Sequence, residues 1–361
     1  MKGIRGAVGI LGLALVAACG GTGTTGTTGT TGTTGQGSTA QLPEVTIATA
    51  NNMLHTAEFV GVEKGFFLQH GVKVKLQVLQ TGAEINKALQ AGSAEFGGGS
   101  ITAIPTARQA GLELKLFVPY MNNATTPDDD NALAVVARAD SGIRPGAWAS
   151  FVGKKVGLAT GGTGDEYLSR LLSKAGVDRK QVTLLNVQPG DQLAAIQGKQ
   201  VDAISTWEPY QTIILDKLGT DAVLVQRGGG TLGYILGLSA TDEYEQAHAG
   251  VVQKMADAMV ETEAWVRSHK REAAVIATHW IPGLDTTSAT QGIQHLNFDP
   301  RVSGCTLKAF TDSTRTLVAQ NKLTADIPAS DQVTSKFVTK SRQTMPQAFG
   351  DLPPVPASCS A

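Results

Sequence analysis

Residues 154–206, which begin KKVGLATGGTGDEYLSRLLSKAG and end VDAIST, decide the fold class of this chain. KKVGLA predicts a short strand, GGTG a turn, and DEYLSRLLSKAG a helix that ends at a glycine. The segments VTLLNV, DQLAAIQG and VDAIST then predict a strand, a helix and a strand. Alternation of this kind is typical of α/β units with parallel strands.

The same alternation precedes this stretch. Strands are predicted at 45–50, 73–79, 95–99, 114–120 and 133–137, from runs such as VTIATA and KVKLQVL. Helices are predicted at 56–69 and 84–90, and after Glu243 the pattern is helical almost throughout. The pattern therefore indicates two blocks of strands and helices, followed by a helical C-terminal region.

The folded part, about 320 of the 361 residues, exceeds one ordinary core. We therefore predict an α/β fold of two lobes with mainly parallel sheets. Residues 43–137 and 238–361 are expected to form lobe 1, and residues 138–237 lobe 2.

Ligands of such sheets bind beyond the carboxyl ends of the strands. The predicted strand exits therefore supply the candidate ligand-binding residues. These are Asn51, Asn52, Ser100, Ile101, Gly162, Thr163, Trp207 and Glu208, with His55 at the start of the next helix. A lone histidine is more often a surface or capping residue, so His55 is the weakest member of this set.

The glycine turn at 161–164 has two interpretations. Glycines followed by a helix N-terminus can form a cradle for an anion, because the backbone approaches closely and presents N–H groups. Alternatively, Thr163 and Glu166 match the capping box, in which each side chain satisfies a backbone donor at the helix start. The two interpretations are compatible if a ligand uses only backbone N–H groups. The turn is not a phosphate-binding P-loop, because the GK[ST] ending is absent.

Trp207 and Glu208 end an apolar strand. The tryptophan could stack on a flat ligand or pack in the core, and its N–H needs a partner in either case. Pro209 suits the first turn of a helix, so Glu208 could stabilise the helix dipole or accept hydrogen bonds from a ligand amine.

The N-terminus predicts export. Residues 1–18 combine the basic Lys2 and Arg5 with an apolar run, as signal peptides do. Cys19 follows two alanines, which resembles the site at which bacterial lipoproteins are cut and acylated. Residues 19–42 are mostly Gly and Thr and predict a disordered tether. An ordinary signal peptide with an incidental cysteine is the alternative.

Charge, cysteine content and the lack of catalytic motifs limit the functions and partners that the sequence supports. The formal net charge is −1, and no basic block occurs, so nucleic acid is an unexpected partner. With Cys19 lipidated, Cys305 and Cys359 remain as an even pair in an oxidising compartment, and we predict a disulfide between them. Two free buried thiols are the alternative. The motifs HExxH, GxSxG and CxxC are absent, so nothing supports an enzyme.

The segments EKGFFLQHGVKVKL, KALQAGSAEFGGGSI, GKKVGLATGGTGDEYLSRLLSKAGVD and QGKQVDAISTWEPY occur in an order that resembles the solute-binding proteins for nitrate, sulfonates, taurine and thiamine-pyrimidine precursors. The resemblance spans roughly residues 45–281. It implies a two-lobed type II periplasmic-binding-protein fold, with crossing segments near Arg138 and at 227–237. It also implies capture of one small solute for an ABC importer, with the strand-exit residues as the pocket.

No Arg or Lys stands at the predicted strand exits, whereas Asp165 and Glu208 lie near them. An unpaired carboxylate facing an anion would be costly, so the sequence favours an amine or a heterocycle over nitrate or a simple sulfonate.

We expect no cofactor, no metal and a monomer tied to the membrane by lipid, with the permease and ATPase subunits as partners. A pyrimidine-synthesis-type enzyme on the same fold and a lipid-anchored sensor without transport are the alternatives.

Overall fold

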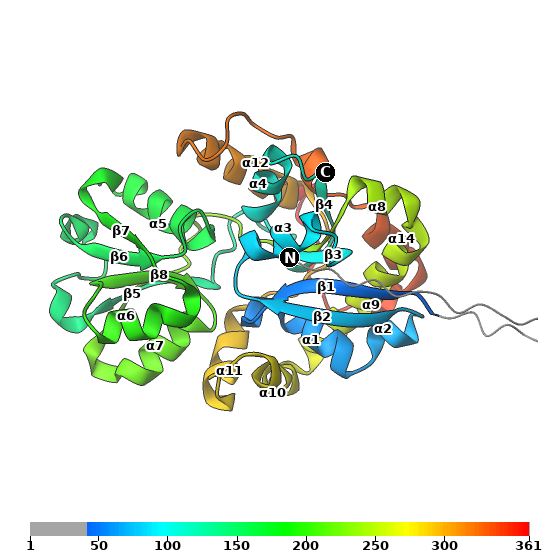
Figure 1. Cartoon of the computed structure of the whole chain (residues 1–361), viewed down its shortest axis with the longest axis horizontal. Helices are drawn as coiled ribbons and strands as arrows, with labels where there is room; N and C mark the ends of the chain where they lie inside the picture. The colour runs from blue at the N-terminus through cyan, green and yellow to red at the C-terminus, as the bar shows by residue number, and fades with distance from the viewer. Residues whose placement is uncertain (1–41, 361) are drawn as a thin grey trace, which may run out of the picture. The chain divides into compact units, whose positions relative to one another are not determined.

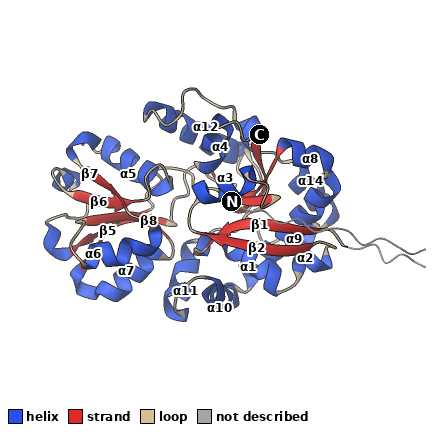
Figure 2. Ribbon diagram, viewed as in Figure 1, coloured by secondary structure: helices blue, strands red, loops and turns tan. Residues whose placement is uncertain are grey.

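The computed structural model describes residues 42–360. Signal peptide, Cys19 and nearly all of the predicted tether lie outside these residues. The described strands form two five-stranded sheets, seen as two groups of arrows in Figure 2. Both sheets belong to one compact unit.

The first sheet has the order β2-β1-β3-β10-β4. Its strands are β1 (Glu44–Ala50), β2 (Lys73–Leu79), β3 (Phe96–Ser100), β4 (Leu114–Met121) and β10 (Leu236–Thr241). The second sheet has the order β7-β6-β8-β5-β9. Its strands are β5 (Leu133–Arg138), β6 (Lys155–Leu158), β7 (Thr183–Asn186), β8 (Ala203–Trp207) and β9 (Ala222–Arg227).

Both sheets are mainly parallel, as predicted. In the first sheet β10 pairs antiparallel with β3 and β4, so the other four strands share one direction. In the second sheet β5 pairs antiparallel with β8 and β9, and again four strands run together. The reversed strand of each sheet is the one that begins directly after the chain crosses from the other sheet. We call each sheet with the helices packed on it a lobe.

The sheets move the expected boundaries between the lobes. β5 belongs to the second sheet, so the first crossing precedes Leu133 rather than following residue 137. β10 belongs to the first sheet, so the second crossing lies at residues 228–235 rather than ending at 237. Strand pairing, which a linear pattern does not contain, causes both shifts. That each lobe is a separate domain stays a prediction.

The helices follow the predicted alternation, with one break. The helix expected at 56–69 is divided into α1 (Thr56–Glu63) and α2 (Phe66–Gln69) at Gly65, whose φ of 74° is left-handed. The helices near the first sheet's strand ends are α3 (Gly82–Gln90) and α4 (Ala103–Gln109), and those of the second lobe are α5 (Thr163–Lys174), α6 (Gln192–Gln197) and α7 (Tyr210–Leu218).

The C-terminal region is helical, as expected. It comprises α8 (Asp242–Ala247), α9 (Ala249–Ser268), α10 (Lys270–Trp280), α11 (Thr286–Gly292), η7 (Ile293–His295), α12 (Gly304–Ala319), α13 (Ala329–Gln332) and α14 (Lys336–Thr344). α9 packs on α1, α14 and β4, whereas α11 contacts α7 and α12 contacts α5 (Figure 1). The C-terminal region therefore touches both lobes.

Candidate functional site

A cavity of about 510 Å³ lies where the carboxyl ends of strands from both sheets meet. β1, β2 and β3 supply residues from their ends, and so do β6, β7 and β8. The reversed strand β10 contributes its beginning, Leu236, instead. This is the place expected for a ligand of parallel sheets, and the volume is typical of a small-molecule pocket.

Six of the nine predicted ligand-binding residues line this pocket. They are Asn52, His55, Ser100, Gly162, Thr163 and Trp207. The other three, Asn51, Ile101 and Glu208, lie next to lining residues in the sequence but do not line it. Their ligand-binding role remains untested, and the geometry gives a different environment for each.

Ile101 is fully buried, and its backbone N–H donates to the carbonyl of Ile235 at 3.0 Å. Asn51 uses its backbone: its N–H donates to Leu79, and its carbonyl accepts from the hydroxyl of Tyr210 at 3.2 Å. Both residues therefore support the pocket wall rather than face its interior.

Glu208 is fully buried beside basic side chains. Its Oε1 lies 2.6 Å from Nη1 of Arg227 and 2.7 Å from Nδ1 of His295. It also accepts from Gln211 and Thr212. Burial raises the pKa of Glu208, but His295, Arg227 and Gln211 outweigh burial and lower it below its usual value. The expectation of an unpaired carboxylate at this strand exit was wrong.

Asp165 is also paired. Its Oδ1 lies 2.5 Å from Arg179 and its Oδ2 lies 2.7 Å from Lys322, and the carboxylate is fully buried. Neither Asp165 nor Glu208 lines the pocket. The argument against an anionic solute assumed unpaired carboxylates and is therefore no longer supported. The basic partners Arg179, Lys322 and His295 lie outside the strands, and Arg227 ends β9, a strand that the sequence did not predict.

The glycine turn is a helix N-terminus without the predicted capping box. Gly162 is the N-cap of α5, no side chain caps it, and Thr163 is the first helical residue. The carboxylate of Glu166 instead accepts from Arg170 and, at 2.9 Å, from Ser313. The first N–H groups of a helix have no helical acceptor, so this turn can serve as the anion cradle.

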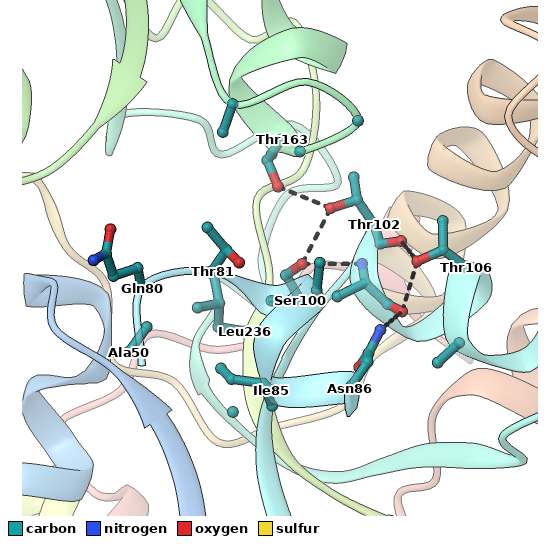
Figure 3. A pocket seen from close by; sticks show the side chains of 18 of the residues that line it. Ala50, Gln80, Thr81, Ile85, Asn86, Ser100, Thr102, Thr106, Thr163 and Leu236 are labelled. Carbon is teal, nitrogen blue, oxygen red and sulfur yellow. Dashed lines mark hydrogen bonds between the residues drawn. The ribbon is translucent and has the colours of Figure 1, made fainter. Parts of the chain in front are cut away.

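Two side-chain hydrogen bonds hold the cradle against the first lobe. The hydroxyls of Thr163 and Thr102 lie 3.1 Å apart, and Thr102 lies 3.1 Å from the hydroxyl of Ser100 (Figure 3). This hydroxyl chain joins the second lobe to the first. Gly164 allows α5 to sit against β8, because a Cβ there would lie only 2.8 Å from the carbonyl oxygen of Ser205.

His55 is oriented by a buried network. Its Nδ1 lies 3.0 Å from Oε2 of Glu58 and 2.9 Å from the hydroxyl of Tyr120. Burial, with Glu58 next, raises the pKa of Tyr120 well above its usual value, so the phenol stays protonated. Because Nδ1 is occupied, Nε2 is the ring nitrogen available to a ligand. The interpretation of His55 as a surface residue was wrong, because it is buried and lines the pocket. His55 does occupy the N-cap position of α1, but its side chain makes no capping hydrogen bond.

Three lining side chains hold polar atoms that are buried and have no partner among the described residues. They are Nε1 of Trp207, Oε1 of Gln188 and Oδ1 of Asn86. A buried indole N–H without an acceptor is costly, so such atoms are expected where a ligand completes the hydrogen bonds.

The sequence did not predict several of the residues that line the pocket. They are Gln80, Thr81, Thr102, Gln188, Tyr234 and Leu236. Gln80 and Gln188 follow strands β2 and β7, so the strand-exit rule could have identified them if it had been applied to every strand. Tyr234 and Leu236 carry no such signal, because a reversed strand brings its beginning to this edge.

The described lining residues include no acidic side chain, and the basic side chains among them are His55 and Lys87. Within residues 42–360 no group of three or more His, Cys, Asp and Glu side chains could hold a metal ion. No described helix is long and apolar enough to cross a membrane. The polar side chains of the lining can bind a polar solute through hydrogen bonds.

The family model described as NMT1/THI5 like matches residues 52–273, more than half of the chain. The chain belongs to the NMT1/THI5-like family. This confirms the resemblance seen in the sequence, and the matched span includes every pocket residue from Asn52 to Leu236.

Named relatives of this NMT1/THI5-like protein are binding proteins. The taurine-binding periplasmic protein of Escherichia coli is 24% identical over 317 residues, which are 83% of this chain and 94% of the relative. An alkanesulfonate-binding protein, SsuA of Xanthomonas axonopodis pv. citri bound to MOPS, shares the fold with a TM-score of 0.70 and 20% identity. That match covers 82% of this chain and 99% of SsuA.

The nitrate-binding protein NrtA of Synechocystis PCC 6803 also has a TM-score of 0.70, at 11% identity, over 87% of this chain and 92% of NrtA. These structures confirm the two-lobed type II periplasmic-binding-protein fold for this NMT1/THI5-like protein. Its role as a solute-binding protein agrees with the function of its named relatives.

Proposed function

We propose that this protein captures a small organic anion, of the sulfonate class, between its two lobes and delivers it to the permease and ATPase of an ABC importer. It does so as a monomer and without chemistry. The observation that carries the proposal is the pocket itself: strand ends of both sheets and a helix N-terminus surround a cavity whose described lining holds no carboxylate.

The donors of the pocket suit an oxyanion. In the cradle the N–H of Gly162 donates to the carbonyl of Ala159, so the backbone N–H of Thr163 is the one offered to an oxyanion, and Ser100 adds a hydroxyl. Trp207 adds an indole N–H that lacks a protein acceptor among the described residues. Two relatives in different organisms are named for taurine and alkanesulfonates, which supports the same class.

A solute with an amine or a heterocycle, which the sequence favoured, loses its main support because Asp165 and Glu208 are paired away from the cavity. Gln188 still offers an acceptor, so an anion that also carries a donor, such as an amino group, fits the lining better than nitrate.

A thermal-shift and calorimetry panel tests this class. Taurine, longer alkanesulfonates and MOPS are compared with nitrate, simple amines and pyrimidines at equal concentration. Ligands that bind only the folded state raise Tm. At a free ligand concentration of a hundred times Kd, the free energy of unfolding increases by about 2.7 kcal/mol. Stabilisation by amines or pyrimidines, with none by sulfonates, would overturn the proposed class.

Mass spectrometry of the solute after release tests whether the protein alters it, because a changed mass would indicate an enzyme.

We also propose that Cys19 is acylated and holds the protein at the extracytoplasmic face of the membrane, where a tether keeps the carrier close to its importer. Intact mass of membrane-extracted protein tests this: a mature form that begins at Cys19 should carry the mass of its acyl groups. A soluble mature form without that mass, or a Cys19→Ala variant that fractionates like the wild type, would contradict the anchor. Growth on the bound solute, compared between cells with and without this protein, separates transport from sensing, because a carrier is needed for uptake of the solute.

A further inference from the structure

A partly buried ion pair joins the C-terminal region to the second lobe beside the glycine turn. Nζ of Lys322 lies 2.7 Å from Oδ2 of Asp165. The Asp165 side chain is fully buried and that of Lys322 is 19% exposed. Asp165 stands in the first turn of α5, in the second lobe, whereas Lys322 follows α12 in the C-terminal region. A lysine outside the pocket therefore reaches the helix that forms the cradle.

The backbone of Lys322 is fixed to the first lobe. Its carbonyl accepts from the side-chain amide of Gln109, the last residue of α4, at 3.1 Å. The carbonyl oxygen of the same amide accepts from the N–H of Thr324 at 2.6 Å. Gln109 thus holds the chain on both sides of the lysine. Because α4 also begins beside the pocket at Ala103, Lys322 and the first-lobe wall of the pocket form one body.

Asp165 connects Lys322 to the glycine turn. The oxygen that binds Lys322 also accepts the backbone N–H of Gly161 at 2.9 Å. The other oxygen binds Nη2 of Arg179, from the second lobe. Gly161 has a left-handed φ of 81° and lines the pocket beside Gly162. The carboxylate therefore connects a first-lobe cation, a second-lobe cation and the turn itself.

The charge of Lys322 matters for an anion. Burial raises the pKa of Asp165, but the bond to Lys322, the Gly161 N–H and the nearby Arg179 outweigh burial and lower it, so the carboxylate is charged. With the lobes apart, Arg179 alone would compensate a negative charge directly behind the cradle. Closure adds a second cation, which makes the cradle more favourable for an anion at the moment the pocket closes.

We propose that Lys322 is a positioning residue that couples closure of the lobes to the shape and charge of the cradle, acting through Asp165 on the Gly161–Thr163 turn. Its effect on the solute rests on the proposed function, whereas its effect on the turn does not.

Hydrogen exchange of ligand-free protein tests the coupling without any solute. Peptides spanning residues 160–164 are compared in the wild type, Lys322→Met, Lys322→Arg and the control Lys308→Met. Lys308 is a surface lysine on the same α12, paired with Asp312 and 58% exposed. We expect the amide exchange rate of these peptides to rise about tenfold in Lys322→Met, because coupling between two sites typically changes an equilibrium by such a factor. The rate should stay unchanged in Lys322→Arg and Lys308→Met.

Unchanged exchange in Lys322→Met, or an equal rise in Lys308→Met, would overturn the proposal. Asp165→Asn tests the same contact from the other side if Lys322→Met does not fold. In the double variant the two effects should not add, because the lysine acts only through the carboxylate. Additive effects would place its action elsewhere and overturn the mechanism.

Binding of MOPS, measured by stopped-flow Trp fluorescence, then tests the consequence for the solute. Lys322→Met should dissociate about tenfold faster with an unchanged association rate, and Lys322→Arg should stay close to the wild type. Wild-type protein that binds no sulfonate, together with the expected exchange result, would reject the proposed solute class and retain the coupling. An unchanged dissociation rate in Lys322→Met would overturn the coupling to the solute.

Discussion

Oε1 of Glu208 lies 2.6 Å from Nη1 of Arg227 and 2.7 Å from Nδ1 of His295. Arg227 ends β9 of the second lobe, whereas His295 ends η7 in the C-terminal region. A carboxylate directly after the pocket residue Trp207 is therefore committed to holding the C-terminal region against the second lobe. These ion pairs give the carboxylate a structural role, and the ligand contact that its place in the sequence suggested stays a prediction.

Glu208→Gln should destabilise the fold in a pH-dependent way. Its folded-state pKa is lowered below the ordinary 4.5, so the carboxylate stabilises the fold above that pH, and this is lost as the pH falls through the folded pKa. Removing one partner of a buried pair should cost about 2–4 kcal/mol at pH 7. Urea unfolding at pH 7 and at pH 4 and below measures the difference, which should shrink in acid.

The exposed Glu243 offers a matched control, because Glu243→Gln should change stability by less than about 0.5 kcal/mol at both pH values. A Glu208→Gln cost that is the same at pH 7 and at low pH would show that charge is not the origin of the effect.

Trp207→Phe should weaken solute binding about tenfold while leaving stability within about 1 kcal/mol. The substitution keeps an aromatic ring in the wall but removes the buried N–H that has no partner among the described residues. Calorimetry with the best sulfonate of the panel measures the affinity. Trp148, which stacks on Phe151 away from the pocket, gives the control Trp148→Phe. Equal affinities of both variants would mean that the solute does not use the indole N–H.

Gly98→Ala should disturb the pocket from inside the sheet. A Cβ at Gly98 would lie 2.4 Å from Cε1 of His55 and 2.6 Å from the hydroxyl of Tyr120, so the network that orients His55 must shift. Overpacking of this kind costs about 2 kcal/mol, and binding should weaken as well. Gly190→Ala, where a Cβ would meet nothing within 4 Å, should do neither. Urea unfolding measures the stability of both variants, and calorimetry measures their solute affinity. Equal losses in Gly98→Ala and Gly190→Ala would mean that the effect does not come from strain at the His55 network.

Cys305 and Cys359 place their Cα atoms 4.7 Å apart and their Sγ atoms within bonding distance, which supports the proposed disulfide. The pair is separated by 54 positions, and closing such a loop contributes about 4 kcal/mol in the chain-entropy model. The double variant Cys305→Ala/Cys359→Ala should lose about that much. Thiol labelling of unfolded, unreduced protein provides the chemical check, and two reactive thiols from these positions would exclude the bridge.

The sequence predicted the elements well because the signals that form them are local. The strand β2 matches its predicted bounds, residues 73–79, since alternation is visible within seven residues. The failures occurred where distant residues decide. Glu166 binds Ser313 instead of closing a capping box, and Glu208, whose ligand contact stays a prediction, pairs with Arg227.

For the pocket, the sequence identified the correct edge of both sheets but not which side chains face inward. Asn52 lines the cavity and Asn51 does not; likewise Ser100 lines it and Ile101 is in the core. Neighbouring residues after a strand point in different directions, and the packing of the next element selects between them. Composition and periodicity do not contain that choice.

By itself, the sequence determined the α/β class, the mainly parallel strands and the edge of the sheets at which the cavity lies, because hydrophobic periodicity and the exit rule for parallel strands are properties of short segments. Only the tertiary structure decided the charge of the site. Burial makes each carboxylate depend on partners such as Arg179, Lys322 and His295, and these come from remote segments that packing alone brings together.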